Sequence, residues 1–501
     1  MTDARALLLI LDGAGLDDPK PGNAVTSRTM PTLFECMARF GFATLEASGK
    51  PVGLDDGQVG NSEIGHTTIG AGFVIPSTLS RIEAAFGDGV WSANPLWRVL
   101  SSARRLHIAG LLSDAGVHGH LQSIVQSATL AWQNGIQDIV IHPVLDGVDS
   151  QAGTAPALLA QLRAALADIS GARIGVIMGR RWFCDRSGQL DMTRRYVAAL
   201  VGASELPRYR DGDLSEHLKN ASEATFVGHA FSPQCDVLPG EPVLLTQHRA
   251  DRAVQVARVL TETNPVYSLV ELADAVPMDR VFFPTRPLTQ GLGFELRRHQ
   301  LKSVRISESC KFPHVTYFVN GLNRDLEGDE ICIETIPESQ FADRPEMSIA
   351  AVSGEIVRSL RDPTNRVVIA NIPNLDQIGH LGSYDVAARA ADHVDQALRE
   401  ILAVCREEGW TAIVTADHGN ADRTIDSLGR PFGSHTERPV PLCVISAPGV
   451  LWDWRAQNGS LANVAPTVLT VLGLPHPSYM TESLISKAPP AREQLERRGA
   501  A

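Results

Sequence analysis

The sequence lacks the features that mark secreted, membrane-spanning or nucleic-acid-binding proteins. Its seven cysteines are dispersed over 501 residues without a CxxC pair, which is typical of reduced thiols in a cytoplasmic protein. No apolar run approaches the roughly 18 residues that a membrane-spanning helix needs, so we expect no membrane partner. Lys and Arg number 45 against 57 Asp and Glu, and the net charge of −12 argues against a nucleic-acid partner. We therefore expect a cytoplasmic protein, with a monomer as the starting expectation for its assembly.

Short aliphatic runs alternate with helical stretches along the chain, and each run stops abruptly at a polar or glycine-rich turn. Continuous Val, Ile and Leu runs are typical of parallel strands that helices cover on both faces. The predicted strands are Ala6–Leu11, Leu106–Leu112, Ile139–Ile141, Ile174–Met178, Val367–Ala370 and Ala412–Thr415. The predicted helices include Ala155–Ile169, Ala250–Thr261 and Val386–Cys405. This alternation predicts an α/β protein whose ligands bind at the carboxyl ends of the strands.

Carboxylates and imidazoles gather after aliphatic runs late in the chain. Asp376 and His380 are four residues apart, so on a helix they would share one side. Asp417 and His418 directly follow a predicted strand, and His435 lies in the turn-like segment GSHTERPVP. These side chains suit Mn²⁺, Zn²⁺ or Mg²⁺. Any one of them could be an ordinary surface residue, but the whole set predicts a metal site.

Two residues near the N-terminus are ambiguous when each is taken alone. Ser62, in the segment GNSEIGH, could cap a helix, with Glu63 favouring the helix dipole, and alone that interpretation is favoured. The functional alternative is a nucleophile whose hydroxyl loses its proton to a bound divalent cation. Asp12, at the end of the first predicted strand, could start a turn with the following glycine or ligate a metal.

The middle of the chain is rich in cationic candidates instead. Arginines bind carboxylates and phosphates through paired hydrogen bonds, although each arginine alone is more commonly a solvated surface residue. Arg249 and Arg252 are three residues apart and would share a helical face. The candidate binding residues in and just after this segment are His118, Asp149, Arg180, Arg186, Arg249, Arg252 and Lys311.

This distribution predicts an inserted domain, since the candidate metal ligands lie near both ends of the chain. One metal site can draw on both ends only if the segment between them forms a separate domain that leaves and returns. The length allows about two to four domains. We expect a discontinuous metal-binding domain of residues 1–76 and 285–490, an inserted domain of residues 77–284, and a tail of residues 491–501.

Several motifs, in order, resemble those of one known family. The segments GNSEIGH, DAGVHGH, KFPHVTYFVNG, NLDQIGH, VTADHGNAD and SHTERPVP resemble the motifs of the cofactor-independent (2,3-bisphosphoglycerate-independent) phosphoglycerate mutases. The resemblance runs from Asp12 to about Ile485, nearly the whole chain. It implies an alkaline-phosphatase-like doubly wound sheet domain that carries an inserted α/β phosphotransferase domain.

The resemblance also implies roles for the candidate residues. It implies two divalent cations, which we expect to be Mn²⁺, with Mg²⁺, Co²⁺ or Zn²⁺ as alternatives. One cation would be held by Asp12, Ser62, Asp417 and His418, and the other by Asp376, His380 and His435. Ser62 matches the family's phosphoserine nucleophile, and Asp149 is the carboxylate expected to handle hydroxyl protons. The substrate-binding set would be His118, Asp149, Arg180, Arg186, Arg249, Arg252 and Lys311.

The substrate half departs from the family pattern, whereas the metal half is intact. Val148 replaces the usual arginine of a DGRD segment, and Phe73 replaces the arginine of GAGR. The segment GRRWFCDR replaces GRYYAMDR and introduces Arg181, which could refill the gap that Val148 leaves. The plain alternative is that Val148 packs against the core of the inserted domain.

The leading functional hypothesis is a phosphomutase that interconverts 2-phosphoglycerate and 3-phosphoglycerate, both small phosphorylated carboxylic acids. A second is a paralogous mutase that acts on a glycerate analogue, such as a phosphonate of specialised metabolism, and Val148 favours it. A third is a metal-dependent phosphatase, which needs the metals but not the arginine-rich insertion. A fourth, a binding protein without activity, is disfavoured because all seven predicted ligand positions hold competent residues.

Overall fold

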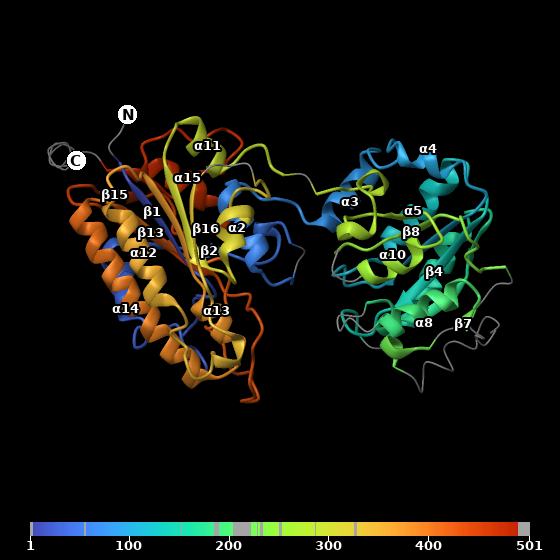
Figure 1. Cartoon of the computed structure of the whole chain (residues 1–501), viewed down its shortest axis with the longest axis horizontal. Helices are drawn as coiled ribbons and strands as arrows, with labels where there is room; N and C mark the ends of the chain where they lie inside the picture. The colour runs from blue at the N-terminus through green and yellow to red at the C-terminus, as the bar shows by residue number, and fades with distance from the viewer. Residues whose placement is uncertain are drawn as a thin grey trace, which may run out of the picture. The chain divides into compact units, whose positions relative to one another are not determined.

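The chain divides into two compact units, each built around its own sheet (Figure 1). Unit 1 comprises Met1–Ser77 and Arg286–Ala501, and unit 2 comprises Thr78–Thr285. The predicted α/β class is confirmed, since strands alternate with helices in both units. The structure is a computed structural model that describes residues 4–54, 57–151, 153–184, 190–203, 222–227, 229–230, 234–249, 253–285, 287–324 and 328–488.

The central strand of unit 1 comes from the start of the chain, and its neighbours come from the last third. Within the described residues, the main sheet consists of β1 (Ala6–Leu11), β2 (Phe42–Glu46), β10 (Ser303–Glu308), β11 (Asp329–Ile333), β12 (Val367–Ile372), β13 (Thr411–Thr415), β14 (Val440–Ile445) and β16 (Asn458–Ser460). Their order is β11-β10-β12-β1-β13-β14-β2-β16. Strand β1 pairs in parallel with β12 and β13, so that Leu8 lies opposite both Ile369 and Ile413.

Helices cover both faces of this sheet (Figure 1). The helices of unit 1 are α1 (Pro31–Phe40), α2 (Ser62–Ala71), α11 (Leu292–Arg298), α12 (Ile349–Arg361), α13 (Asn374–Gly379), α14 (Tyr384–Glu408) and α15 (Val464–Val471). Helices α1, α12 and α14 pack together, as do α2, α11 and α15. The long helix α14 buries an apolar stripe at three- and four-residue spacing, Ala387, Ala391, Val394, Leu398 and Ile401. A small second sheet pairs β15 (Trp452–Trp454) with β17 (Ile485–Lys487).

Unit 2 has a mostly parallel sheet of its own. Its strands are β3 (Leu106–Leu112), β4 (Ile139–Leu145), β5 (Ala172–Ile174), β6 (Val176–Gly179), β7 (His229–Ala230), β8 (Val243–Leu245) and β9 (Val266–Ser268). The order is β7-β6-β4-β3-β8-β9, β5 also pairs with β4, and β7 alone of these described strands runs antiparallel to its neighbour. The helices are α3 (Thr78–Gly87), α4 (Leu96–Leu100), α5 (Leu121–Gln133), α6 (Ala155–Leu166), α7 (Arg180–Phe183), α8 (Leu190–Leu200) and α10 (Val254–Thr261).

Two predicted strands of unit 2 differ from the observed ones. Strand β4 continues beyond Ile141, because the buried His142 side chain has a partner in His107 on the adjacent strand. His107 Nδ1 lies 3.0 Å from His142 Nε2. The run predicted as one strand over Ile174–Met178 is two strands, β5 and β6, separated at Gly175. There the N–H of Val176 donates over 3.1 Å to Nδ1 of the His142 side chain, which lies on the neighbouring strand β4.

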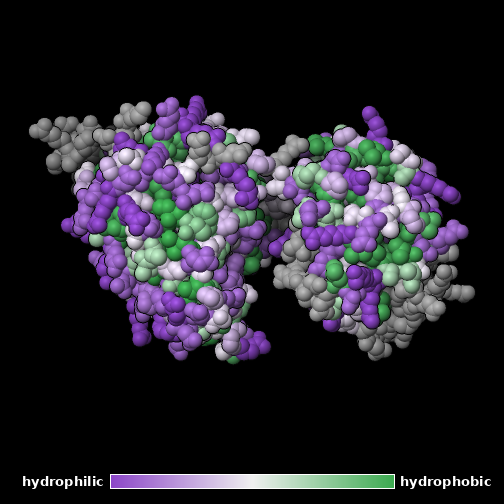
Figure 2. All heavy atoms as spheres, viewed as in Figure 1, coloured by the Kyte–Doolittle hydropathy of each residue, from purple (hydrophilic) through white to green (hydrophobic). Residues whose placement is uncertain are grey.

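Side chains on the visible face of each unit form a mosaic of hydrophilic and smaller hydrophobic areas (Figure 2). Among the helices that the structure describes, none is both long and apolar enough to cross a bilayer.

Candidate active site

Charged and polar side chains from four parts of the chain meet at the carboxyl edge of the unit 1 sheet. Asp12 follows β1, Lys311 comes shortly after β10, and Asp376 lies on α13 just after β12. Asp417 and His418 follow β13. Parallel strands place their carboxyl ends at one edge of a sheet, which brings residues from distant parts of the sequence together. All five are buried.

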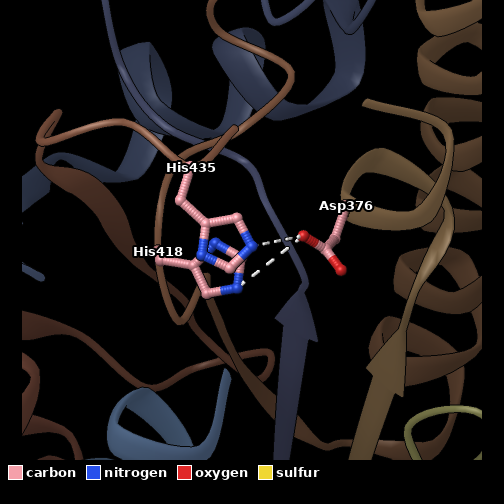
Figure 3. Close-up of side chains that lie close together, drawn as sticks. All are labelled: Asp376, His418 and His435. Carbon is pink, nitrogen blue, oxygen red and sulfur yellow. Dashed lines mark ion pairs between the residues drawn. The ribbon is translucent and has the colours of Figure 1, made fainter. Parts of the chain in front are cut away.

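Two groups of potential ligands share His418. Asp376, His418 and His435 form one, and Asp12, Asp417 and His418 form the other, with the ligand atoms of each group within 4.8 Å of one another. Both imidazole rings of the first group point toward Asp376 (Figure 3). Asp376 Oδ1 lies 3.2 Å from His435 Nε2 and 3.9 Å from His418 Nε2. The two rings stack with their centroids 3.8 Å apart.

His380 joins the Asp376 group from the end of α13. Its Nε2 is 3.3 Å from Asp376 Oδ1, and its Nδ1 is 2.7 Å from the carbonyl oxygen of Gly433. His435 Nδ1 lies 2.8 Å from the carbonyl oxygen of Gly60. A carbonyl only accepts, so both Nδ1 atoms carry the hydrogen and both Nε2 lone pairs are directed at the cluster when the rings are neutral. The hydrogen bond with Asp376 holds the pKa of His380 above its ordinary value.

Asp12, Asp417 and His418 crowd together on the other side. His418 Nε2 is 3.5 Å from Asp12 Oδ1 and 3.4 Å from Asp417 Oδ2. Burial and repulsion by Asp417 raise the pKa of Asp12 to about 7. Burial also lowers the pKa of His418 to about 4, so this imidazole is neutral at neutral pH. A neutral imidazole between two carboxylates has the donor set of a divalent-metal site.

Lys311 supplies positive charge to this cluster. Its Nζ lies 2.9 Å from Asp12 Oδ1 and 2.8 Å from Asp376 Oδ2, and it also donates to Ser62 Oγ. Burial lowers the pKa of this lysine, but the surrounding carboxylates raise it by more, so the group stays an ammonium. The sequence grouped Lys311 with the substrate-binding residues, whereas its contacts here are with the predicted metal ligands.

The charges in the cluster fit divalent cations. Asp12, Asp376 and Asp417 bring three carboxylates into a buried region, and the Lys311 ammonium contacts the first two of them. Asp417 Oδ2 is buried, and its polar neighbours are two imidazole nitrogens, His66 Nδ1 at 3.2 Å and His418 Nε2 at 3.4 Å. Buried carboxylates need compensating charge, which a cation would supply. The residues present therefore fit a metal centre.

Ser62 is the first residue of α2 and is not its N-cap. The N-cap is Asn61, whose side-chain oxygen accepts from the N–H of Ile64 over 3.0 Å, so the capping interpretation of Ser62 is wrong. Because Asn61 satisfies the helix end, the Ser62 hydroxyl is left to face the cluster. Its Oγ lies 2.9 Å from His418 Nε2 and accepts from Lys311.

A second polar cluster lies at the carboxyl edge of the unit 2 sheet. Arg180 Nη1 is 2.8 Å from Asp149 Oδ2 and also donates to Asp146. His118 Nε2 lies 4.0 Å from the same Asp149 oxygen. The N–H of His248 donates to the carbonyl of His118 over 3.0 Å, so the loop that carries the exposed Arg249 lies against the His118 loop. Arg186 and Arg252 lie outside the described residues.

Val148 is exposed in the loop that carries Asp149. Its relative exposure is 64%, so the interpretation that it packs into the core of the inserted domain is wrong. The predicted substitute, Arg181, is an exposed residue of α7 next to the buried Arg180.

Sequence reasoning missed three residues that hold the others in place. Asp146 accepts from the N–H groups of Asp149 and Ser150 as well as from Arg180, and its position at the end of an aliphatic run was the signal for it. Asn371 lies at the end of β12, and His66 stands in the motif of Ser62. Asn371 donates a hydrogen bond to Asp12, and His66 lies in close polar contact with Asp417, so each contacts a predicted metal ligand.

Comparisons with known proteins agree over nearly the whole chain. Residues 4–476 match the model of the Metalloenzyme superfamily. The chain is 33% identical to the 2,3-bisphosphoglycerate-independent phosphoglycerate mutase of Picosynechococcus sp., over 96% of this chain and 97% of that protein. It is 31% identical to the protein of the same name from Acetivibrio thermocellus, over 97% and 100% of the two chains.

A solved structure is also similar. The crystal structure of Leishmania mexicana phosphoglycerate mutase at low cobalt concentration matches with a TM-score of 0.68 and 26% identity, over 97% of this chain and 98% of that one. Together with the superfamily match, this likeness confirms the predicted alkaline-phosphatase-like fold class.

Proposed function

This chain belongs to the Metalloenzyme superfamily and, within it, to the 2,3-bisphosphoglycerate-independent phosphoglycerate mutases, and we propose that it interconverts 2-phosphoglycerate and 3-phosphoglycerate through a phosphoserine at Ser62. The observation that carries this proposal is the position of the Ser62 hydroxyl. It lies at the start of a helix, 2.9 Å from His418 Nε2 and in contact with the Lys311 ammonium, among the predicted metal ligands.

Two divalent cations, Mn²⁺ in the first instance, would be held by the two groups of ligands. The first set is Asp12, Ser62, Asp417 and His418, and the second is Asp376, His380 and His435. His418 also lies near Asp376, so it is close to both sets of ligands. When bound, such cations lower the pKa of a ligated hydroxyl and neutralise charge on a transferring phosphoryl group.

The chain's own residues support a two-step transfer. Ser62 Oγ attacks phosphorus, the bond from phosphorus to a glycerate oxygen breaks, and the group then returns to the neighbouring glycerate oxygen as the serine ester breaks. Lys311 donates a hydrogen bond to Ser62 Oγ, which stabilises that oxygen when it is negatively charged, both before attack and on return. Ser62 is also buried, which limits the access of water to the serine ester.

We assign the acid-binding role to unit 2. Arg180 is held by Asp146 and Asp149, so its guanidinium is fixed at the carboxyl edge of the sheet beside His118. Arg180 and Arg249 would bind the substrate's carboxylate and phosphate, to which arginine is well matched. Asp149 would take the proton from the attacking glycerate hydroxyl and give a proton to the glycerate oxygen that leaves. Ser62 and the predicted metal ligands belong to unit 1.

The second candidate is a mutase for a related acid, and the exposure of Val148 favours it. An exposed valine beside Asp149 offers no charge where the resemblance places arginine, so the site would bind an acid with less negative charge or a different shape. The relatives' shared name favours the phosphoglycerates. We also infer a monomer that works in the cytoplasm.

One experiment separates these possibilities. The purified chain, loaded with Mn²⁺, is incubated with 3-phosphoglycerate, and the products are followed by phosphorus NMR. A 2-phosphoglycerate signal supports the proposal, inorganic phosphate indicates a phosphatase, and an unchanged spectrum favours the related acid. Acid quenching followed by peptide mass spectrometry then tests for phosphate on Ser62.

A further inference from the structure

His66 and Asn371 form a buried pair beside the candidate metal ligands and have no role in the function proposed above. His66 lies on α2 four residues after Ser62, so the two side chains share a face of the helix. Asn371 lies in β12, and both side chains are fully buried. Asn371 Nδ2 is 2.7 Å from Asp12 Oδ2 and 3.0 Å from His66 Nε2.

These contacts fix which atoms carry hydrogen. The ionised Asp12 carboxylate, which is the form that binds a cation, only accepts hydrogen bonds, so the amide nitrogen of Asn371 faces it; the flipped amide would place two acceptor oxygens 2.7 Å apart. The same amide nitrogen donates its second hydrogen to His66 Nε2, which therefore accepts. The hydrogen of the neutral imidazole is then on His66 Nδ1.

That hydrogen points back into the cluster. His66 Nδ1 lies 2.9 Å from the carbonyl oxygen of Ser62 and 3.2 Å from Asp417 Oδ2. One imidazole and one amide thus join Asp12, Asp417 and the backbone of Ser62. These are three of the four residues that would hold one cation.

The pair also determines which carboxylate oxygen faces the cluster. Because Asn371 occupies Asp12 Oδ2, it is Asp12 Oδ1 that lies near Lys311 and His418. Asp417 Oδ1 accepts from the N–H of His418 over 3.0 Å, and its Oδ2 lies toward His66. His66 Nε2 accepts from Asn371, which contacts Asp12, and His66 Nδ1 lies close to Ser62 and Asp417. A histidine that merely filled the core would not make both kinds of contact.

We propose that His66 and Asn371 are positioning residues that hold the Asp12 and Asp417 carboxylates in the orientation that binds a divalent cation. The inference rests on the proposed metal-binding role of Asp12 and Asp417. Partners of this kind orient the ligands and typically change metal affinity by about 10- to 100-fold when removed.

The test measures Mn²⁺ affinity directly, by calorimetric titration of the full chain after chelation. His66→Phe and Asn371→Leu should each weaken Mn²⁺ binding by about 10- to 100-fold while circular dichroism shows a folded protein. His66→Asn should restore most of the affinity lost in His66→Phe, because its amide can donate from the place of Nδ1. A purely structural role predicts no such rescue.

The matched control is His314→Phe. The ring of His314 is 5.2 Å from that of His66, and its buried Nδ1 has no hydrogen-bond partner among the described residues, so its loss should leave Mn²⁺ affinity unchanged. Should His66→Phe fail to fold, Asn371→Leu carries the test, since leucine has a similar volume and makes no hydrogen bond. Folded variants that bind Mn²⁺ as tightly as the wild type would overturn the positioning role alone, whereas a wild type that binds no divalent cation would overturn the proposed function.

Discussion

The Lys311 ammonium lies between Asp12 and Asp376, at 2.9 Å from an oxygen of the first carboxylate and 2.8 Å from an oxygen of the second. These two aspartates belong to different predicted cation groups, so one side chain neutralises part of both. Lys311 thereby connects the two predicted cation groups. The same ammonium also donates a hydrogen bond to Ser62.

Lys311→Met should destabilise the metal-free protein strongly, because it leaves buried carboxylates without their cation. Breaking a buried pair on one side costs about 3–5 kcal/mol in the free energy of unfolding. Urea unfolding in the presence of a chelator measures this loss. The matched control is Lys302→Met, which removes an exposed pair with Asp329 and should cost no more than about 1 kcal/mol. Equal effects of the two substitutions would contradict the role assigned to Lys311.

Ser62→Ala should abolish phosphoryl transfer and leave the fold intact, because it removes the nucleophile and little volume. We expect kcat to fall by at least about a thousandfold. Steady-state kinetics measures the loss, and acid quenching should trap phosphate on Ser62 only in the wild type. Substantial mutase activity in the variant would exclude the covalent mechanism.

Chelation should remove activity and lower the unfolding temperature together. A cation present at about 100 times its dissociation constant stabilises the folded state by about 2.7 kcal/mol. Exhaustive chelation followed by addition of Mn²⁺ should reverse both losses, as followed by an activity assay and a thermal unfolding scan. Full activity in a sample with no metal by elemental analysis would rule out the metal centre.

Glu308 should make the stability of unit 1 depend on pH. Burial raises the pKa of this carboxyl from 4.5 to about 7. The folded state therefore holds the proton more tightly than the unfolded state, and the free energy of unfolding should fall as pH rises from about 4.5 to about 7. Glu308→Gln, which can still accept from the N–H of Ser348, removes this ionisation. The substitution should reduce the fall in the free energy of unfolding over this pH range by about 3 kcal/mol or less, as measured by urea unfolding. Parallel pH profiles of the two proteins would show that Glu308 does not titrate there.

Val148→Arg should raise kcat/KM for 3-phosphoglycerate by about one to two powers of ten, if the arginine gains a charge-assisted hydrogen bond worth about 1.5–3 kcal/mol. The exposed position accepts a long side chain without disturbing the core. Arg181→Tyr should lower kcat/KM if Arg181 compensates for Val148. Ordinary mutase rates in the wild type that neither substitution changes would show that the substrate has not shifted.

The sequence predicted the framework of the site because its signals are local. A short aliphatic run such as Ala6–Leu11 that stops at a polar turn favours a buried strand, and polar residues that follow such a strand lie at a sheet edge. Asp12, Asp417 and His418 were recognisable on that ground, and the structure brings them within ligand distance of one another.

What the sequence could not predict depends on contacts between distant residues. Asn371 contacts Asp12 across 359 positions of the chain, and nothing near Asn371 indicates which carboxylate it will bind. Similarly, His142 was taken as the end of a strand because an imidazole is polar, yet its partner His107 on the adjacent strand allows β4 to continue. The sequence also left two positions open for Val148, a substrate-facing loop and the core of the inserted domain, and the structure exposes it.

The position of β1 between β12 and β13 has a consequence for synthesis on the ribosome. The first strand is completed early, but its two partners leave the ribosome only after more than 350 further residues have been added. Unit 2 is one continuous segment, so all its strands are available before β12 is made. Domains fold as units during synthesis, so we expect unit 2 to fold first while the aliphatic Ala6–Leu11 segment waits unpaired. During that interval the nascent chain carries an uncovered hydrophobic strand, which makes it a candidate for chaperone binding.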